Sequence, residues 1–302
     1  MAISDAGIIH SLLNFFLNTN SNNYSDEQAR KAIFKATQPQ VKQYKKGREN
    51  INSHFDKEKS LDRLIILRLF AFDLWNIILS KKPKSRVAYV VEEAILRVEI
   101  ATDENITLIG HGYGIGATNN LRQMLESLAI VKYIKDKGEI EAERFQDHAK
   151  YQSSEILQEK KIIDKYKEEQ SFHTPYGWIS DKENNSYSKL IKLMGNEDYN
   201  GMYTLCCNLI HASSFSMEIT KTMNHERQGC EYFPLGLEDT IRFNEKILVD
   251  FLVFIIDSYM DDSKPAIPGL DCFPEKRFYK IFLKTIVDNM EGCPGDELLK
   301  LV

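Results

Sequence analysis

Three side chains of this sequence could carry chemistry together. Arg122 and Glu126 lie in the apolar segment 121–134, and His211 lies in the apolar segment 203–214. Both segments have the 3- and 4-residue spacing of an amphipathic helix, so Arg122 and Glu126 share one helical face. If the two helices pack side by side, a guanidinium, a carboxylate and an imidazole meet inside a helical bundle. There the imidazole could move a proton and the cation could stabilise developing negative charge.

Polar and small residues accompany His211. Thr204 and Asn208 share its helical face by the same spacing rule, Tyr203 opens the segment, and small residues up to Ser214 leave space beyond the imidazole. We therefore expect Tyr203, Thr204, Asn208 and Ser214 to contact a bound substrate. The residues leave a structural alternative open, in which the same polar groups lock the helices in register without doing chemistry.

We expect neither a metal ion nor a cofactor. Cys207 and His211 are spaced to share a helical face, but no third or fourth ligand lies near them in the sequence. The glycine run 110–116 fits neither the dinucleotide fingerprint nor a P-loop, so a turn or close helix packing is expected there. The five cysteines form no CxxC pair, which favours a reducing cytoplasm over a disulfide framework.

Composition restricts the partners. The net charge of −5 argues against a surface that attracts phosphates over its whole area, although a local basic pocket remains compatible with it. The start of the chain lacks the positive region of a secretory signal. The two most apolar stretches, 61–79 and 247–256, are too short or too charged to span a bilayer. We therefore expect a cytoplasmic protein without membrane contact.

Helical periodicity dominates the chain, and no alternating strand pattern of useful length occurs. The sequence thus predicts an all-α, multi-helix bundle. We expect an N-terminal helical region over 1–102 and a bundle over 103–302, with one continuous domain as the alternative. The predicted helices cover residues 25–46 with a break or kink at Pro39, 60–82, 85–101, 121–134, 139–169, 203–211, 238–260 and 275–290.

The order of the polar residues resembles a known family. Leu121-Arg122-x-x-x-Glu126, followed by Tyr203-x-x-x-x-Asn208-x-x-His211, is similar to a bacterial helical family, the domain-of-unknown-function 5677 family, over roughly 100–225. That family looks like a distant relation of HEPN-type helical domains, many of which are dimeric, metal-independent ribonucleases in toxin–antitoxin or phage-defence systems. The resemblance implies a HEPN-like core with an additional N-terminal helical region, and a homo-oligomer.

The resemblance also implies roles for the three groups. His211 would serve as general base or acid on RNA, Arg122 would stabilise charge on the phosphorane, and Glu126 would orient Arg122 or share the proton transfer. HEPN ribonucleases carry an arginine shortly before the histidine on one helix, whereas this chain has none between Met202 and His211. Arg122 would have to supply that cation.

A second hypothesis stays open beside the ribonuclease. The chain could be a non-catalytic helical module that binds a protein partner or a nucleotide in a defence or regulatory system. The polar groups would then grip a ligand or fix helix register, and the sequence alone leaves open whether the protein is an enzyme.

Overall fold

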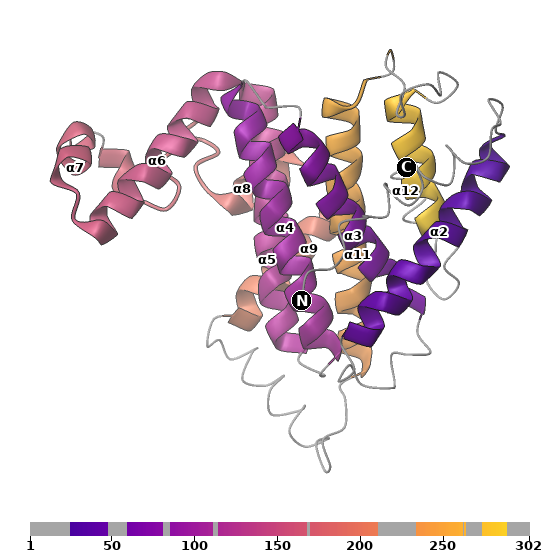
Figure 1. The fold of residues 1–302 in the computed structure, drawn as a ribbon. Coiled ribbons are helices and arrows are strands. Elements are labelled where there is room, and N and C mark those ends of the chain that lie inside the picture. Colours follow the sequence, from indigo (N-terminus) through magenta and orange to yellow (C-terminus); the bar gives the residue numbers. More distant parts are fainter. Residues whose placement is uncertain are drawn as a thin grey trace, which may run out of the picture.

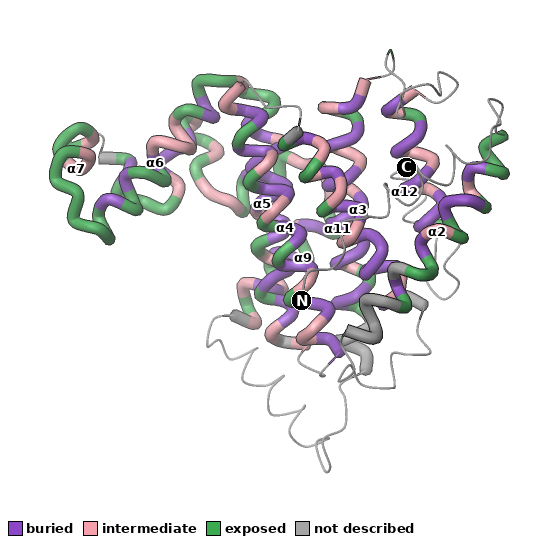
Figure 2. Tube along the Cα trace, viewed as in Figure 1, coloured by how far each residue is buried: buried purple, intermediate pink, exposed green. Residues whose placement is uncertain are grey.

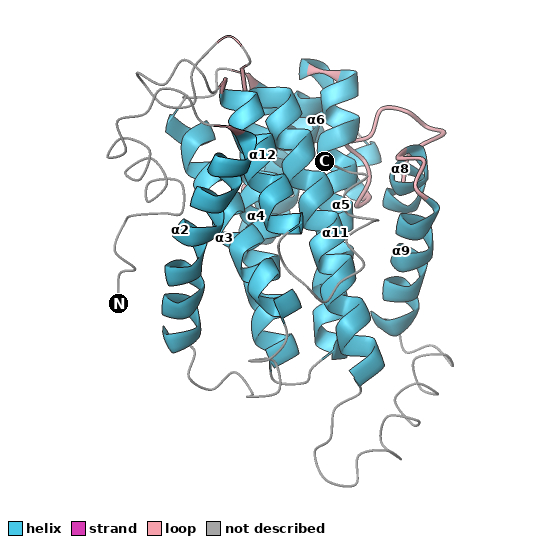
Figure 3. Cartoon of the chain, turned by 90° about the vertical axis from the view of Figure 1, so that its right-hand side faces the viewer, coloured by secondary structure: helices cyan, strands magenta, loops and turns pink. Residues whose placement is uncertain are grey.

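The protein is all-helical throughout the part of the chain that its structure, a computed structural model, describes. That part comprises residues 25–47, 59–80, 85–110, 114–167, 170–210, 234–261, 263 and 274–288. It forms ten α-helices and one short 3₁₀-helix and contains no β-strand (Figures 1 and 3), which confirms the predicted all-α class, while the HEPN-like core stays a prediction. In chain order the elements are α2 (Asp26–Gly47), α3 (Lys59–Ser80), α4 (Arg86–Gly110), α5 (Gly114–Lys137), α6 (Glu139–Leu157), α7 (Lys160–Tyr166), η2 (Gln170–His173), α8 (Tyr187–Leu193), α9 (Glu197–Ile210), α11 (Pro234–Tyr259) and α12 (Glu275–Asp288).

Four long helices, α3, α4, α5 and α11, form the centre of the bundle (Figure 1). Helices α2 and α12 pack together on the α3 side, and α8 and α9 pack on α5. Helix α3 is central because it is apolar on most of its circumference, and such a helix must be covered on several sides. None of the described helices combines the length and the apolarity needed to cross a membrane.

Helix α4 is longer than the sequence indicated. It continues past the predicted end at residue 101 as far as Gly110 and runs unbroken through positions 102 and 103. Its buried face continues with Asn105, Ile106 and Ile109, so packing holds the extra turns in place. The proposed division of the chain into 1–102 and 103–302 stays a prediction.

Helix α2 begins and ends close to the predicted positions, and it continues through Pro39. Ser25 caps it, since its Oγ accepts from the backbone N–H of Gln28 at 3.2 Å and the Gln28 side chain accepts from the N–H of Ser25 at 2.9 Å. Of the two expectations at Pro39, a break or a kink, the break is wrong, because the helix continues to Gly47. The proline removes one backbone hydrogen bond, but the apolar face resumes with buried Val41, and its packing keeps the chain helical.

The segment after Gly138 projects from the bundle as an arm of α6, α7 and η2, and α7 at its end lies largely in solvent (Figures 1 and 2). The predicted single helix over 139–169 is wrong. Gln158 takes a left-handed conformation with φ of 57°, and this ends α6. The chain then folds back, so that Tyr166 and Phe172 pack against Tyr151.

Helix α6 also holds the loop that leads back to the bundle. One face of the helix presents Glu141, Arg144 and His148 to the loop 174–180. These side chains bind the N–H and hydroxyl of Ser180, the carbonyls of Gly177 and Trp178, and the carbonyl of Thr174. The loop thereby inserts Trp178, which is 1% exposed, into the core beside α5.

A buried ion pair joins helices from opposite parts of the chain. Arg63 of α3 donates from Nε to one oxygen of Glu245 on α11 at 2.8 Å and from Nη2 to the other at 2.5 Å. The two side chains are 1% and 0% exposed. Two parallel bonds to a carboxylate are the strong arrangement for arginine, and removal from water makes the pairing obligatory.

We expect Arg63→Met to lower the free energy of unfolding by about 3–5 kcal/mol, because Glu245 would keep its charge in the core without this guanidinium. The double variant Arg63→Met, Glu245→Leu should lose clearly less, since neither buried charge remains. Urea unfolding followed by circular dichroism measures both. A double variant that is less stable than Arg63→Met would contradict this account of the pair.

Gly177 is required by close approach of the backbone. A Cβ at this position would lie 1.8 Å from the carbonyl oxygen of Ser171, so Gly177→Ala should destabilise the protein by about 2 kcal/mol or more. Gly201 is the matched control, because a Cβ there meets nothing within 4 Å and the residue lies exposed in α9. Gly201→Ala should raise stability by about 0.5–1 kcal/mol. Urea midpoints that shift equally for the two variants would disprove the steric argument.

Candidate functional site

Helices α5 and α9 pack together, as the two-segment hypothesis required. Arg122 of α5 donates from Nε to Oε1 of Glu126 at 2.9 Å. Tyr203 of α9 donates its hydroxyl to the same oxygen at 3.0 Å. The guanidinium also lies over the Tyr203 ring, 5.6 Å from the ring centroid. Glu126 therefore links a cation of its own helix to a phenol of the neighbouring helix.

The surroundings keep Arg122 charged and Tyr203 neutral near pH 7. Burial opposes the charge of Arg122, but the Glu126 carboxylate outweighs it and raises the pKa of the guanidinium. Burial, followed by the Glu126 charge, raises the pKa of Tyr203. At neutral pH the cluster thus holds a cation, a carboxylate that accepts twice, and a neutral phenol. Such a cluster can bind or stabilise an anion, but neither Arg122 nor Tyr203 can exchange a proton near pH 7.

The cluster is only partly removed from solvent. The side chains of Arg122 and Glu126 are 24% and 13% exposed, whereas those of Arg63 and Glu245 are almost fully buried. Glu126 binds Nε of Arg122. Among the described residues, none forms a hydrogen bond with the two terminal nitrogens of the Arg122 guanidinium. Part of the Arg122 side chain therefore stays in contact with solvent.

The predicted substrate residues that the structure describes divide into two groups. Tyr203 belongs to the cluster, whereas Thr204 and Asn208 are exposed, and the Thr204 hydroxyl donates to the Asn200 carbonyl of its own helix at 2.8 Å. His211 and Ser214 lie outside the described residues, the described part of α9 ending at Ile210. The meeting of His211 with Arg122 and Glu126 stays a prediction.

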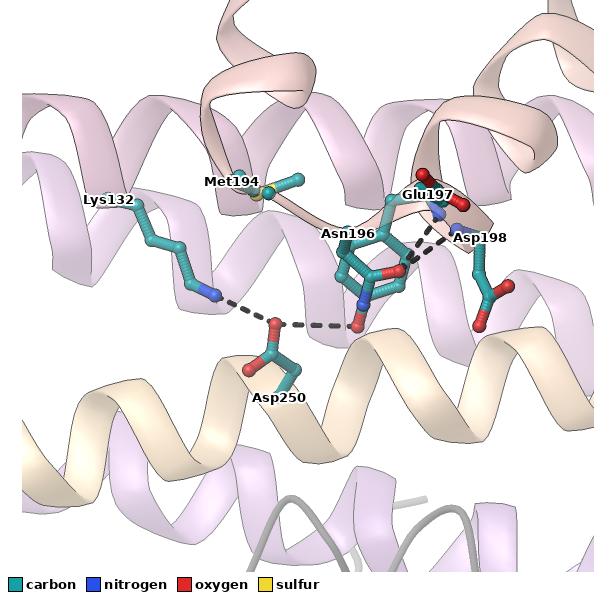
Figure 4. Close-up of a pocket in the computed structure, with 8 residues that line it drawn as sticks. Lys132, Met194, Asn196, Glu197, Asp198 and Asp250 are labelled. Carbon is teal, nitrogen blue, oxygen red and sulfur yellow. Dashed lines mark hydrogen bonds and ion pairs between the residues drawn. The ribbon is translucent and has the colours of Figure 1, made fainter.

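A second polar link lies further along α5. Lys132 of α5 pairs with Asp250 of α11 at 2.8 Å, and the hydroxyl of Tyr199 on α9 donates to the same carboxylate oxygen at 3.4 Å. These residues line an open recess of about 460 Å³ beside the turn from α8 to α9 (Figure 4). The remaining lining residues are Met194, Gly195, Asn196, Glu197 and Asp198.

A comparison with protein families finds one match. Residues 100–229 match a family of unknown function, DUF5677. The match confirms the resemblance over this part of the chain, which includes Arg122, Glu126, Tyr199 and Tyr203. No curated protein and no solved structure matches the chain.

Some residues of the site escaped sequence reasoning. Tyr199, within the DUF5677 match, precedes Tyr203 by four residues, so helical spacing alone could have grouped the two phenols. Asp250 lies outside the match, and in the sequence it stands out only as a charge inside an apolar helix. Tyr187 of α8 also adjoins the cluster, since burial and then the Glu126 charge raise its pKa. No sequence signal marked it.

The cysteines of the DUF5677 region do not form a metal site with other described residues. Within the described ranges, no group of three or more His, Cys, Asp or Glu side chains could hold a metal ion. Cys206 is buried, and burial raises the pKa of its thiol to about 12, so it stays protonated at neutral pH. Cys207 is half-buried and lies close enough to Arg122 to contribute to the raised pKa of the guanidinium.

The raised pKa of Tyr203 predicts a loss of stability in alkali. The pKa of Tyr203 in the folded protein lies above the value of about 10 that a tyrosine has in the unfolded chain. The neutral phenol therefore contributes fully to the free energy of unfolding below pH 10, and this contribution is lost as the pH rises towards the folded pKa. One such group contributes a slope of about 1.4 kcal/mol per pH unit. Tyr203→Phe should remove that slope between about pH 10 and 12.

Urea unfolding at a series of pH values tests this expectation. Tyr89→Phe is the matched control, because Tyr89 is 49% exposed and its replacement should leave the wild-type slope unchanged. An identical alkaline slope for Tyr203→Phe and the wild type would show that the phenol is not held neutral by its surroundings.

Proposed function

We propose that the protein is a HEPN-like, metal-independent ribonuclease of the toxin or phage-defence type, acting as a homo-oligomer on RNA. The observation that supports this proposal best is the fixed position of Arg122. Its guanidinium is tied to Glu126 and Tyr203 at the contact of two helices, stays partly exposed, and adjoins the helix whose sequence leads on to His211.

A cation held in this way suits phosphoryl chemistry. Stabilisation of charge that develops in a transition state is greatest when the cation is oriented beforehand, and Glu126 with Tyr203 provides that orientation. In the proposed reaction the terminal nitrogens of Arg122 bind the non-bridging oxygens of the attacked phosphate. Glu126 acts through Arg122 and not on the substrate.

His211 performs the proton transfers in this proposal. Its imidazole takes the proton of the ribose 2′-hydroxyl, whose oxygen attacks the adjacent phosphorus, and the bond to the 5′-oxygen of the next nucleotide breaks. The departing oxygen then receives a proton from the imidazolium, so the products are a 2′,3′-cyclic phosphate and a 5′-hydroxyl. Thr204, Asn208 and Ser214 contact the nucleotide, and no metal takes part.

One observation favours a second candidate function. Glu126 neutralises Arg122 and also accepts from Tyr203, so the carboxylate already joins the two helices without a substrate. Such a link is what a non-catalytic module needs to fix helix register while it binds a nucleotide or a protein partner. RNA binding without hydrolysis would favour this candidate.

Cleavage of RNA by the purified protein, with and without EDTA, tests the ribonuclease. His211→Ala and Arg122→Ala should each lower the rate by about 100-fold or more, and EDTA should have no effect. The matched controls are His173→Ala and Arg277→Ala, since these two side chains are about half exposed and lie in η2 and α12. Both should cleave at the wild-type rate.

The outcomes separate the candidates. Equal cleavage by the wild type, His211→Ala and Arg122→Ala would exclude this mechanism. A wild type that never cleaves but binds RNA or a nucleotide more tightly than Arg122→Ala would support the non-catalytic module.

A further inference from the structure

Helix α9 is linked to α5 by two carboxylates and not by one. The first link runs through Glu126, in the cluster described above. The second runs through Asp250 and has the same composition, a cation from α5 (Lys132) and a phenol from α9 (Tyr199) on one carboxylate oxygen. Its carboxylate, however, comes from α11, a helix outside residues 100–229.

The geometry makes Asp250 a hub between three helices. One oxygen of its carboxylate lies 2.8 Å from the Lys132 ammonium, a pair visible in Figure 4, and 3.4 Å from the hydroxyl of Tyr199. Tyr199 is 1% exposed, so its hydroxyl depends on partners inside the protein. Besides Asp250, that hydroxyl reaches only a carbonyl of α11, that of Lys246, at 3.4 Å among the described residues. The Asp250 side chain is 16% exposed, which limits screening of its charge by water.

A neighbouring ion pair reinforces the contact of α11 with α9. Lys246, one turn before Asp250 on α11, pairs with Asp198 at 2.5 Å, and its ammonium lies 6.0 Å from the centre of the Tyr199 ring. The beginning of α9 is therefore held by α11, while Tyr203, one turn after Tyr199, is held by α5. A shift of α9 at its beginning must move Tyr203 against Glu126 as well.

We infer that Asp250 is a positioning residue of the α5–α9 site. It sets the placement of α9 against α5, and through α9 it determines how Arg122, Tyr203 and the segment leading to His211 face one another. The inference rests on the proposed function for its consequences on RNA. The structural part of the inference is that Asp250, a residue outside the DUF5677 match, sets the position of α9. This part can be tested without RNA.

Asp250→Asn is the main variant, because asparagine keeps the size of the side chain and loses its charge. Asp257→Asn is the matched control on the same helix, since Asp257 pairs with Lys276 and Lys280 of α12 at 3.1 and 3.0 Å, away from the site. Tyr199→Phe is the second variant and removes a single hydroxyl. It keeps the inference testable if Asp250→Asn fails to fold.

Two readouts distinguish positioning from general stability. The first is the alkylation rate of the half-buried Cys207, followed by peptide mass spectrometry well below the melting temperature, which reports the placement of α9 beside Arg122. We expect Asp250→Asn and Tyr199→Phe to change this rate at least about threefold, a modest effect of local opening, while Asp257→Asn leaves it unchanged. The second is RNA cleavage, where kcat should fall about 10- to 100-fold with KM nearly constant, because misplacement affects the transition state most.

Each outcome decides one question. If the wild type does not cleave RNA, the proposed function fails, and the alkylation rates still decide whether Asp250 positions α9. If Asp250→Asn and Tyr199→Phe alter Cys207 alkylation no more than Asp257→Asn does, the inference is overturned. If alkylation changes as expected but kcat stays at the wild-type value in a cleaving enzyme, Asp250 positions the helix and not the reaction, and the inference is likewise overturned.

Discussion

A charged side chain buried inside a helical bundle must be paired with an opposite charge, and this constraint governs the structure. Arg63 and Glu245 show it in the strictest form, because both side chains are almost fully removed from water and form two parallel hydrogen bonds. Apolar packing among α3, α4, α5 and α11 tolerates sliding and rotation, whereas this pair is satisfied in one register only. The ion pair thus specifies how the early helix α3 lies against the late helix α11, and α9 is placed on that frame.

The same constraint, relaxed by partial exposure, produces the candidate site. One carboxylate oxygen of Glu126, and likewise one of Asp250, accepts hydrogen bonds from a cation and from a phenol. Both links lie at the edge of the bundle, where water still reaches the cation. A fully buried cation would be inaccessible to a substrate, and a fully exposed one would be neither oriented nor strong in water. Arg122 lies between these limits, which is the reason to place chemistry there and not at Arg63.

Local patterns could be predicted from the sequence, and long-range pairings could not. The i, i+4 spacing of Arg122 and Glu126 predicts their contact from helix geometry alone. The packing of α5 on α9 was only a condition of the hypothesis, because an apolar stripe does not say which helix covers it. Asp250 had no such signal, because its pairing with Lys132 depends on the register of helices more than a hundred residues apart in sequence. The break at Gln158 was missed for a related reason, since the aromatic packing behind it on Tyr151 is tertiary.

An overall acidic chain with a neutralised arginine suggests how such a site would act on RNA. With a net charge of −5 the protein cannot rely on general attraction of phosphates, and Glu126 offsets much of the attraction that Arg122 would exert on a substrate in its ground state. The phosphorane carries more negative charge than the diester, so in the proposed reaction the oriented Arg122 guanidinium would attract the transition state more strongly than the bound substrate. Glu126 would lower the attraction for both states, and its contribution to the proposed catalysis would be the orientation of Arg122.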